Sequence, residues 1–159
     1  MKISMAVLVL VASAQPASIY GRQIGASATI TGSPRLRDGT FQLAGRAAIC
    51  GEIPKESSLT GEATFVIELA GDTQGSMTTI AFGAKGLAGR EATAGLFRLS
   101  VGVTTPDGGR PPLYVLNTDP PGRGNSGLAT LTQTAQGSTL KVVGVNDAKE
   151  RIEFSATCR

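Results

Sequence analysis

Short stretches in which apolar and polar residues alternate constrain the fold of this chain more than any other feature. Four of these stretches are clear, and they cover residues 41–49, 63–69, 97–103 and 152–158. A period of two residues places successive side chains on opposite faces of a strand, so each stretch predicts a half-buried β-strand. No segment shows the spacing of an amphipathic helix.

Weaker stretches of the same kind lie between and around the clear ones, at residues 26–31, 78–82, 113–117, 127–133 and 139–145. Together the pattern predicts about nine strands. The 21 glycines fall mostly between the stretches, as turns with positive φ require. We therefore expect an all-β fold, a single antiparallel β-sandwich of immunoglobulin-like or related topology. A closed β-barrel is the alternative, because it has the same period.

The five phenylalanines fall one to a predicted strand, at Phe41, Phe65, Phe82, Phe97 and Phe154. Four of them occupy the apolar positions of a clear strand. We interpret them as residues that fill the core, rather than as a surface on which a ligand stacks.

The first 14 residues have the features of a secretory signal peptide. Lys2 is followed by an uncharged apolar run at residues 3–11 and by the small residues 12–14. Cleavage would leave 145 of the 159 residues, with Gln15 first. We expect residues 15–25 to form a flexible lead-in and residues 26–159 to form one β domain, secreted or periplasmic. No later run predicts a transmembrane helix, which needs about 20 apolar residues.

The only two cysteines are Cys50 and Cys158, 108 positions apart. Behind a signal peptide they are expected to form a disulfide, since exported proteins fold in an oxidising compartment. A loop of this length would be stabilised by about 4–5 kcal/mol. Because Cys158 is the penultimate residue, the bridge would hold the last strand in place.

The position of Cys50 does not fit the alternation of its own strand, because it lies on the opposite parity from Phe41 and Leu43. A bulge near Gly45 would restore the phase, since one extra residue turns all later side chains over. Alternatively the strand ends at Ile49, as the nearby Pro54 suggests, and Cys50 turns inward from a loop.

The composition removes several kinds of chemistry. The chain has no histidine, which excludes Ser-His-Asp and Cys-His catalysis and the usual zinc and copper sites. A paired cysteine supplies no thiolate. A hydrolase built on two carboxylates remains possible, but no pair stands out, and the chain has no Trp and only two Tyr to bind a sugar. We expect a protein that is not an enzyme and holds no cofactor.

Charge gives little indication of a partner. Without Lys2 the chain has 14 basic and 12 acidic residues, and the basic residues are scattered. A nucleic-acid groove needs clustered basic residues and aromatic side chains. We therefore expect no nucleic-acid partner, and the partner is an unknown protein or an envelope component.

Two long loops, at residues 107–112 and 118–126, flank the short predicted strand 113–117. Long loops on a rigid β scaffold often bind partners, and the alternative is that they only connect strands. The candidate binding residues are Asp107, Arg110, Tyr114, Asn117, Asp119, Arg123 and Asn125. The segment 51–55 beside Cys50 is a second candidate, similar in a general way to the binding loop of some protease inhibitors.

Two groups of oxygen-bearing side chains could in principle bind calcium. One is Asn117, Asp119 and Asn125, and the other is Asn146, Asp147 and Glu150. Neither has the spacing of an EF-hand, so we interpret them as turn-forming residues.

The end of the chain carries a family resemblance. The segments 137–144 (GSTLKVVG) and 152–158 (IEFSATC), together with Cys50 after an early strand and a Gly/Asn/Ser-rich stretch at 122–130, resemble the small mycobacterial surface lipoprotein antigens. The resemblance covers the C-terminal quarter and implies a secreted β-sandwich with one disulfide and no known catalysis. The lipidated cysteine of that family is missing here, so the resemblance does not extend to a lipid anchor.

The function we expect is that of a secreted or periplasmic, non-enzymatic binding protein or an envelope-associated structural module. One alternative is a carrier of a small ligand or a protein that acts like a protease inhibitor. The other is a carboxylate-based hydrolase.

Overall fold

A computed structural model describes residues 18–122 and 124–159, apart from the side chains of residues 70–73. All regular secondary structure in this part is β, which confirms the all-β prediction, and no helix in it is long and apolar enough to cross a membrane. The strands are β1 (Gln23–Thr31), β2 (Gly39–Ile53), β3 (Thr64–Gly75), β4 (Met77–Lys85), β5 (Glu91–Ala94), β6 (Arg98–Val103), β7 (Leu113–Asn117), β8 (Ser126–Thr134), β9 (Gly137–Val145) and β10 (Arg151–Cys158).

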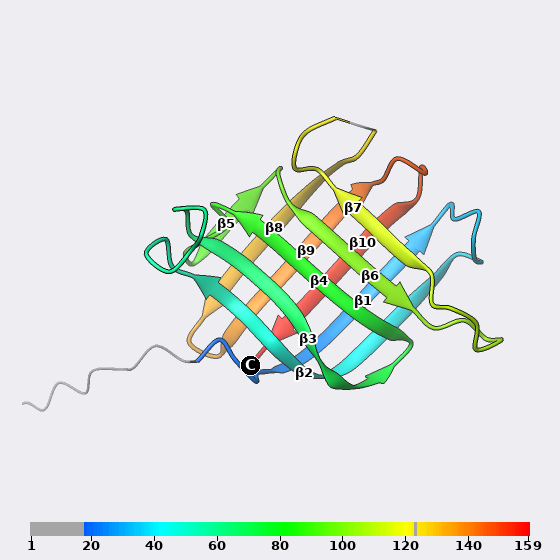
Figure 1. Cartoon of the computed structure of the whole chain (residues 1–159), viewed down its shortest axis with the longest axis horizontal. Helices are drawn as coiled ribbons and strands as arrows, with labels where there is room; N and C mark the ends of the chain where they lie inside the picture. The colour runs from blue at the N-terminus through cyan, green and yellow to red at the C-terminus, as the bar shows by residue number, and fades with distance from the viewer. Residues whose placement is uncertain (1–17, 123) are drawn as a thin grey trace, which may run out of the picture.

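The strands form one antiparallel hydrogen-bonded sheet with the order β5-β8-β9-β10-β1-β2-β3-β4-β6-β7. Most neighbours are consecutive in the chain, while the first and last strands meet in the middle of the sheet, with Ile24 opposite Cys158. The sheet curls strongly, so that β3, β4, β6 and β7 lie across β8, β9, β10 and β1 (Figure 1).

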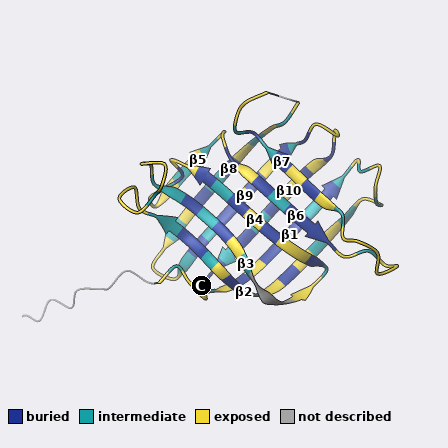
Figure 2. Ribbon diagram, viewed as in Figure 1, coloured by how far each residue is buried: buried dark blue, intermediate teal, exposed yellow. Residues whose placement is uncertain are grey.

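The core lies between these two crossing halves of the sheet. Along β10, for example, Ile152 and Phe154 are buried while Glu153 is exposed, and the same alternation is visible on the other strands (Figure 2). Four of the five phenylalanines are buried as expected, and Phe41 is partly buried against the same core. The interpretation of these residues as core is therefore confirmed.

Two glycines allow the halves to approach closely. A Cβ atom on Gly144 would lie 2.6 Å from a methyl carbon of Leu116, and one on Gly127 would lie 3.0 Å from the ring of Phe97. Side chains of β7 and of the segment before β6 therefore pack directly onto the main chain of β8 and β9. The interior between the two halves is filled by protein atoms at this point.

The described structure has one strand more than the sequence pattern predicts, because β5 is only four residues long and follows no clear alternation. β1 begins at Gln23, within the range 15–25 that we expected to form a flexible lead-in, and Tyr20 pairs with Ile49. The expected signal peptide, residues 1–14, lies outside the described residues.

A bulge in β2 explains the inward position of Cys50. The register between β2 and β3 shifts between Gly45 and Ala47 and again between Ala47 and Ile49. Leu43 and Ala47, which precede the second shift, point into the core, and Cys50 does so after it. A bulge in β2 is confirmed, although the one that turns Cys50 inward lies between Ala47 and Ile49 and not at Gly45. The alternative in which the strand ends at Ile49 is wrong, because β2 continues to Ile53.

Candidate functional site

The polar features of the molecule gather at the two ends of β10. Cys158 ends this strand, and we call its surroundings with Cys50 the disulfide end. Glu150 immediately precedes the strand, and we call its surroundings, with loops 32–38, 104–112, 118–125 and 146–150 and strand β7, the loop end. Figure 1 shows loops 32–38, 104–112 and 146–150 on the side of the molecule away from the C-terminus.

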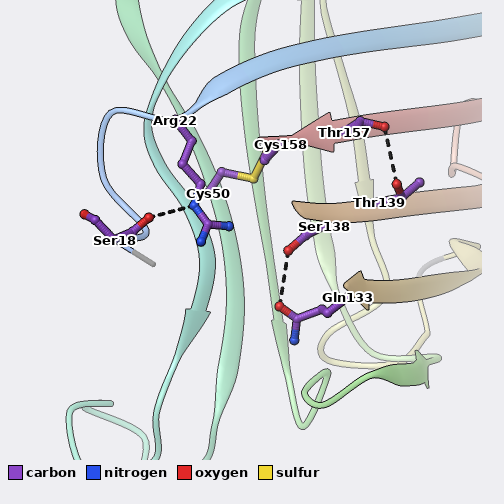
Figure 3. The surroundings of a disulfide bond; sticks show 8 residues. All are labelled: Ser18, Arg22, Cys50, Gln133, Ser138, Thr139, Thr157 and Cys158. Carbon is purple, nitrogen blue, oxygen red and sulfur yellow. Dashed lines mark hydrogen bonds between the residues drawn. A yellow bond between two sulfur atoms is a disulfide. The ribbon is translucent and has the colours of Figure 1, made fainter. Parts of the chain in front are cut away.

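At the disulfide end, Cys50 and Cys158 form the expected disulfide, with their Cα atoms 6.3 Å apart. Both side chains are buried. The bond connects β2 with β10, which lie on either side of β1 in the sheet (Figure 3). It therefore connects the two strands that flank β1, at the end of β10 where Cys158 lies opposite Ile24 of β1.

The chain before β1 follows the bulged part of β2 at this end. The amide of Cys50 donates to the carbonyl of Ile19 at 2.8 Å, and that of Ala47 donates to the carbonyl of Arg22 at 2.9 Å. Gly51 is needed here, because a Cβ atom would lie 2.5 Å from the Ile19 side chain. Residues 19–22 thus continue the hydrogen bonding of β1 along the bulged part of β2.

A second polar contact supports the same end from the other side. The Gln133 amide nitrogen donates to Glu52 at 3.0 Å, and the Ser138 hydroxyl donates to the Gln133 amide oxygen at 3.2 Å (Figure 3). The amide of Gly89 also donates to Glu52 at 3.0 Å. These bonds connect β2, β8 and β9 with the loop before β5.

The loop end contains a buried carboxylate. The Glu150 side chain is 0% exposed, and it accepts hydrogen bonds from the Ser33 hydroxyl at 2.8 Å, the Asn146 amide at 2.8 Å, and Arg35 at 2.6 and 3.1 Å. A buried carboxylate with donors on both oxygens is what low-dielectric surroundings require. We call these four side chains the Arg35–Glu150 network.

Arg35 extends this network to strand β7. Its third guanidinium nitrogen donates to the carbonyl of Leu113 at 2.9 Å, and its carbon lies 4.5 Å from the centre of the Tyr114 ring. Contact with the ring face adds a cation–π attraction. One side chain therefore connects loop 32–38, loop 146–150 and β7.

Electrostatics favour the charged form of Glu150. Burial raises the pKa of this carboxyl, but the hydrogen bonds from Arg35, Asn146 and Ser33 and the charge of Arg35 outweigh burial, so the pKa lies below its usual value. The pKa of Arg35 is raised, mainly by its hydrogen bond to Glu150. The pair is thus ionised over the ordinary range of pH.

Strand β7 is the last strand of the sheet, and one of its edges has no partner strand in the described residues. The carbonyl of Pro112 accepts from Val103 and the amide of Thr118 donates to Phe97, so the even-numbered residues bond toward β6. Because main-chain groups alternate in direction along a strand, those of Leu113, Val115 and Asn117 face the free edge. Leu113 and Val115 are also 46% and 40% exposed. An unpaired edge with exposed apolar side chains is a surface that another chain can pair with.

A hollow of about 260 Å³ lies beside this edge, lined by Val115, Asn117, Pro120, Asn125 and Asp147. Its lining combines two apolar residues, a valine and a proline, with an aspartate and two asparagines. Such a site suits a side chain with an apolar stem and a cationic head.

The residues predicted from the sequence are divided between the two ends of β7. Arg110 is exposed in the loop before the strand, together with Asp107, whose pKa is lowered by hydrogen bonds from Thr105 and from the Gly109 amide. Asn117 and Asn125 lie beyond the strand, in the wall of the hollow.

Three of the predicted residues have other positions. Tyr114 is buried under Arg35, so it supports that side chain and does not face a partner. The amide of Asp119 donates to the Asn117 side chain at 3.1 Å, which is a turn. Arg123 lies outside the described residues.

The fold does not keep together either of the two groups of residues considered for calcium. Asn117 and Asn125 of the first group meet Asp147 of the second, while Glu150 and Asn146 are used within the Arg35–Glu150 network. In the part of the chain that the structure describes, no three His, Cys, Asp or Glu side chains could hold a metal ion together.

Ser33 and Arg35 were missed by the sequence analysis, since nothing in their loop marks them as partners of Glu150, which lies 117 and 115 positions later. No protein-family model, no curated protein and no solved structure matches this chain.

Proposed function

We propose that this is a secreted or periplasmic, non-enzymatic protein that binds a protein or envelope component through its loop end. The observation that carries the proposal is the free edge of β7, with the exposed side chains of Leu113 and Val115 beside the hollow. A disulfide at the opposite end supports export, because such bonds persist in oxidising compartments.

The charged groups support binding rather than catalysis. A hydrolase would need a carboxyl whose pKa is raised so that it can donate a proton. The pKa values of Glu150 and Asp107 are both shifted the other way, and both oxygens of Glu150 already accept hydrogen bonds.

The carrier and inhibitor alternatives receive less support. A carrier needs interior space, whereas Leu116 and Phe97 pack onto Gly144 and Gly127 between the halves of the sheet. An inhibitor needs an extended loop, whereas the chain after β2 folds into turns. The amide of Ser57 donates to the carbonyl of Pro54, and the amide of Gly61 donates to the carbonyl of Ser58.

Export is tested by expressing the whole chain in a bacterial host and measuring the intact mass of the exported protein under native conditions. We expect the mass of residues 15–159 less two hydrogens, with nothing bound. Retention in the cytoplasm would contradict the localisation, and a retained small molecule would favour the carrier.

Binding through the loop end is tested by placing a photo-crosslinking amino acid at Val115 or, as a control, at Val143. The control is matched, since both are outward-facing valines on strands, 40% and 41% exposed. We expect cross-linked products in living cells from position 115 and not from position 143. Equal products from both positions, or none from either, would overturn the proposal.

A further inference from the structure

We propose that a second copy of this chain is a partner of the loop end, and that two copies pair through the free edges of β7 around a two-fold axis. The inference rests on the proposed function, because it uses the same surface. It adds the identity of the occupant and the residues that each copy contributes to the site of the other.

The first argument is the state of the edge. Val115 directs its amide and carbonyl away from β6, and its exposed side chain stands between those of Leu113 and Asn117. Two antiparallel copies with Val115 opposite Val115 would exchange two main-chain hydrogen bonds and bring two apolar side chains together. Pro111, which has no amide hydrogen, lies at the next position that faces the edge and ends the pairing there.

The second argument is the distribution of charge about Val115. Arg110 lies before β7 and the hollow lies beyond it, so a two-fold axis at Val115 brings the segment before β7 of one copy toward the segment after β7 of the other. Pro120 is part of the hollow that also contains the Asp147 carboxylate, and Asp119 precedes it. Arg110 of each copy thus approaches Asp147 of the other, so the same contact forms twice, as a self-complementary interface requires.

The shape and exposure of the two groups agree with this arrangement. Arg110 is exposed and precedes two prolines, which keep the segment extended. The hollow of about 260 Å³ offers Pro120 to the aliphatic stem of an arginine, and Asp147 to its guanidinium.

Arg35 limits the extent of the pairing. Its guanidinium already bonds the Leu113 carbonyl at the free edge, at 2.9 Å. Main-chain pairing is therefore confined to the residues around Val115, and Arg110 in the hollow supplies the rest of the contact. A short ladder between two charged contacts gives a reversible dimer rather than an open-ended assembly.

The experiment is sedimentation equilibrium of the oxidised, signal-cleaved protein over a wide range of concentration. We expect a monomer–dimer equilibrium. Arg110→Asp and Asp147→Arg should each raise the dimer dissociation constant about tenfold or more, because each places like charges together. The double variant should restore the dimer, since it reverses both charges of each pair. Arg46→Asp, an exposed charge change on β2, is the control and should have no effect.

A second pair of variants tests the edge itself. Val115→Lys should abolish the dimer, whereas Val143→Lys should leave it unchanged, and circular dichroism confirms that both fold. A wild type that is monomeric at every concentration overturns the inference, as does a dimer unaffected by Val115→Lys or a double variant without rescue. A monomer that still cross-links to a different protein through position 115 would overturn the inference alone and leave the proposed function standing.

Discussion

The disulfide end and the loop end hold the two ends of β10 by different means. At the disulfide end the contact is covalent and buried, and it joins the two strands that flank β1 in the sheet. At the loop end a buried carboxylate collects donors from two loops, and its arginine reaches an edge strand. The disulfide end is held by a covalent bond between two strands, whereas the loop end is held by side chains that leave part of the β7 edge without a partner strand in the described residues.

This difference separates stability from recognition. A disulfide acts largely by restricting the unfolded chain, so it stabilises the fold without shaping a surface. The Arg35–Glu150 network stabilises the folded state only while its geometry holds, and the same geometry positions β7 and the hollow beside it. The binding surface that we propose thus lies at the end whose loops are fixed by polar contacts.

The largest effect is expected from removing the covalent contact. Replacing Cys50 and Cys158 by alanine should lower the free energy of unfolding by about 4–5 kcal/mol in oxidising buffer, because the closed loop spans 108 residues. Urea unfolding measures the loss. Wild-type protein in reducing buffer should behave like the variant, and equal midpoints for oxidised wild type and variant would contradict the role assigned to the bond.

The next effect is expected at the loop end. Arg35→Met leaves Glu150 buried without its main donor, and should cost about 2 kcal/mol, less than a fully buried pair because the Arg35 side chain is 42% exposed. The matched control is Arg151→Met, which breaks a 2.8 Å pair with Glu153 between two half-exposed side chains and should cost under about 0.5 kcal/mol. Similar losses for the two variants would show that burial of Glu150 has no special weight.

The two ends also differ in how much of each could be predicted from the sequence. The disulfide followed from two cysteines behind a signal-like segment, and the bulge followed from the parity of Cys50 against Phe41 and Leu43. The inference of the bulge uses local alternation, which survives in any sheet, and that of the disulfide uses only the number of cysteines and the expected compartment. The strand order follows from neither, because β1 meets β10 through contacts that no local pattern encodes.

The loop end was only partly accessible. The sequence indicated Asn117, Asn125 and Asp147 as turn residues, and the fold brings them to one hollow from different loops. The partnership of Arg35 with Glu150 depends on two loops meeting over β7, so it could not be read from either loop alone. Tyr114 was expected to face a partner, but the inward parity of its strand position buries it.

A smaller effect is expected where residues 19–22 join the disulfide end. Gly51→Ala would place a methyl group against the Ile19 side chain and should cost about 1 kcal/mol, since Ile19 can shift. Hydrogen exchange of the Cys50 amide, which donates to Ile19, should accelerate. Gly83→Ala is the control, because a Cβ atom there would meet nothing within 4 Å, and unchanged exchange in Gly51→Ala would mean that residue 19 does not protect this end.

The smallest effect concerns pH and separates the ends most cleanly, because a disulfide does not titrate in this range. The pKa of Glu150 is lower in the folded state than its ordinary value of 4.5, so the folded state binds fewer protons. Its contribution is therefore complete above about pH 4.5 and is lost as the pH falls through the lower folded-state value. Urea midpoints measured from neutral pH downward should decline in the wild type, whereas Glu150→Gln should start lower and converge with it in acid.

Asp107, whose pKa is also lowered, titrates in both proteins and cancels from the difference. Glu153→Gln should follow the wild-type curve, and a constant gap between wild type and Glu150→Gln would show that the charge of Glu150 does not support the loop end.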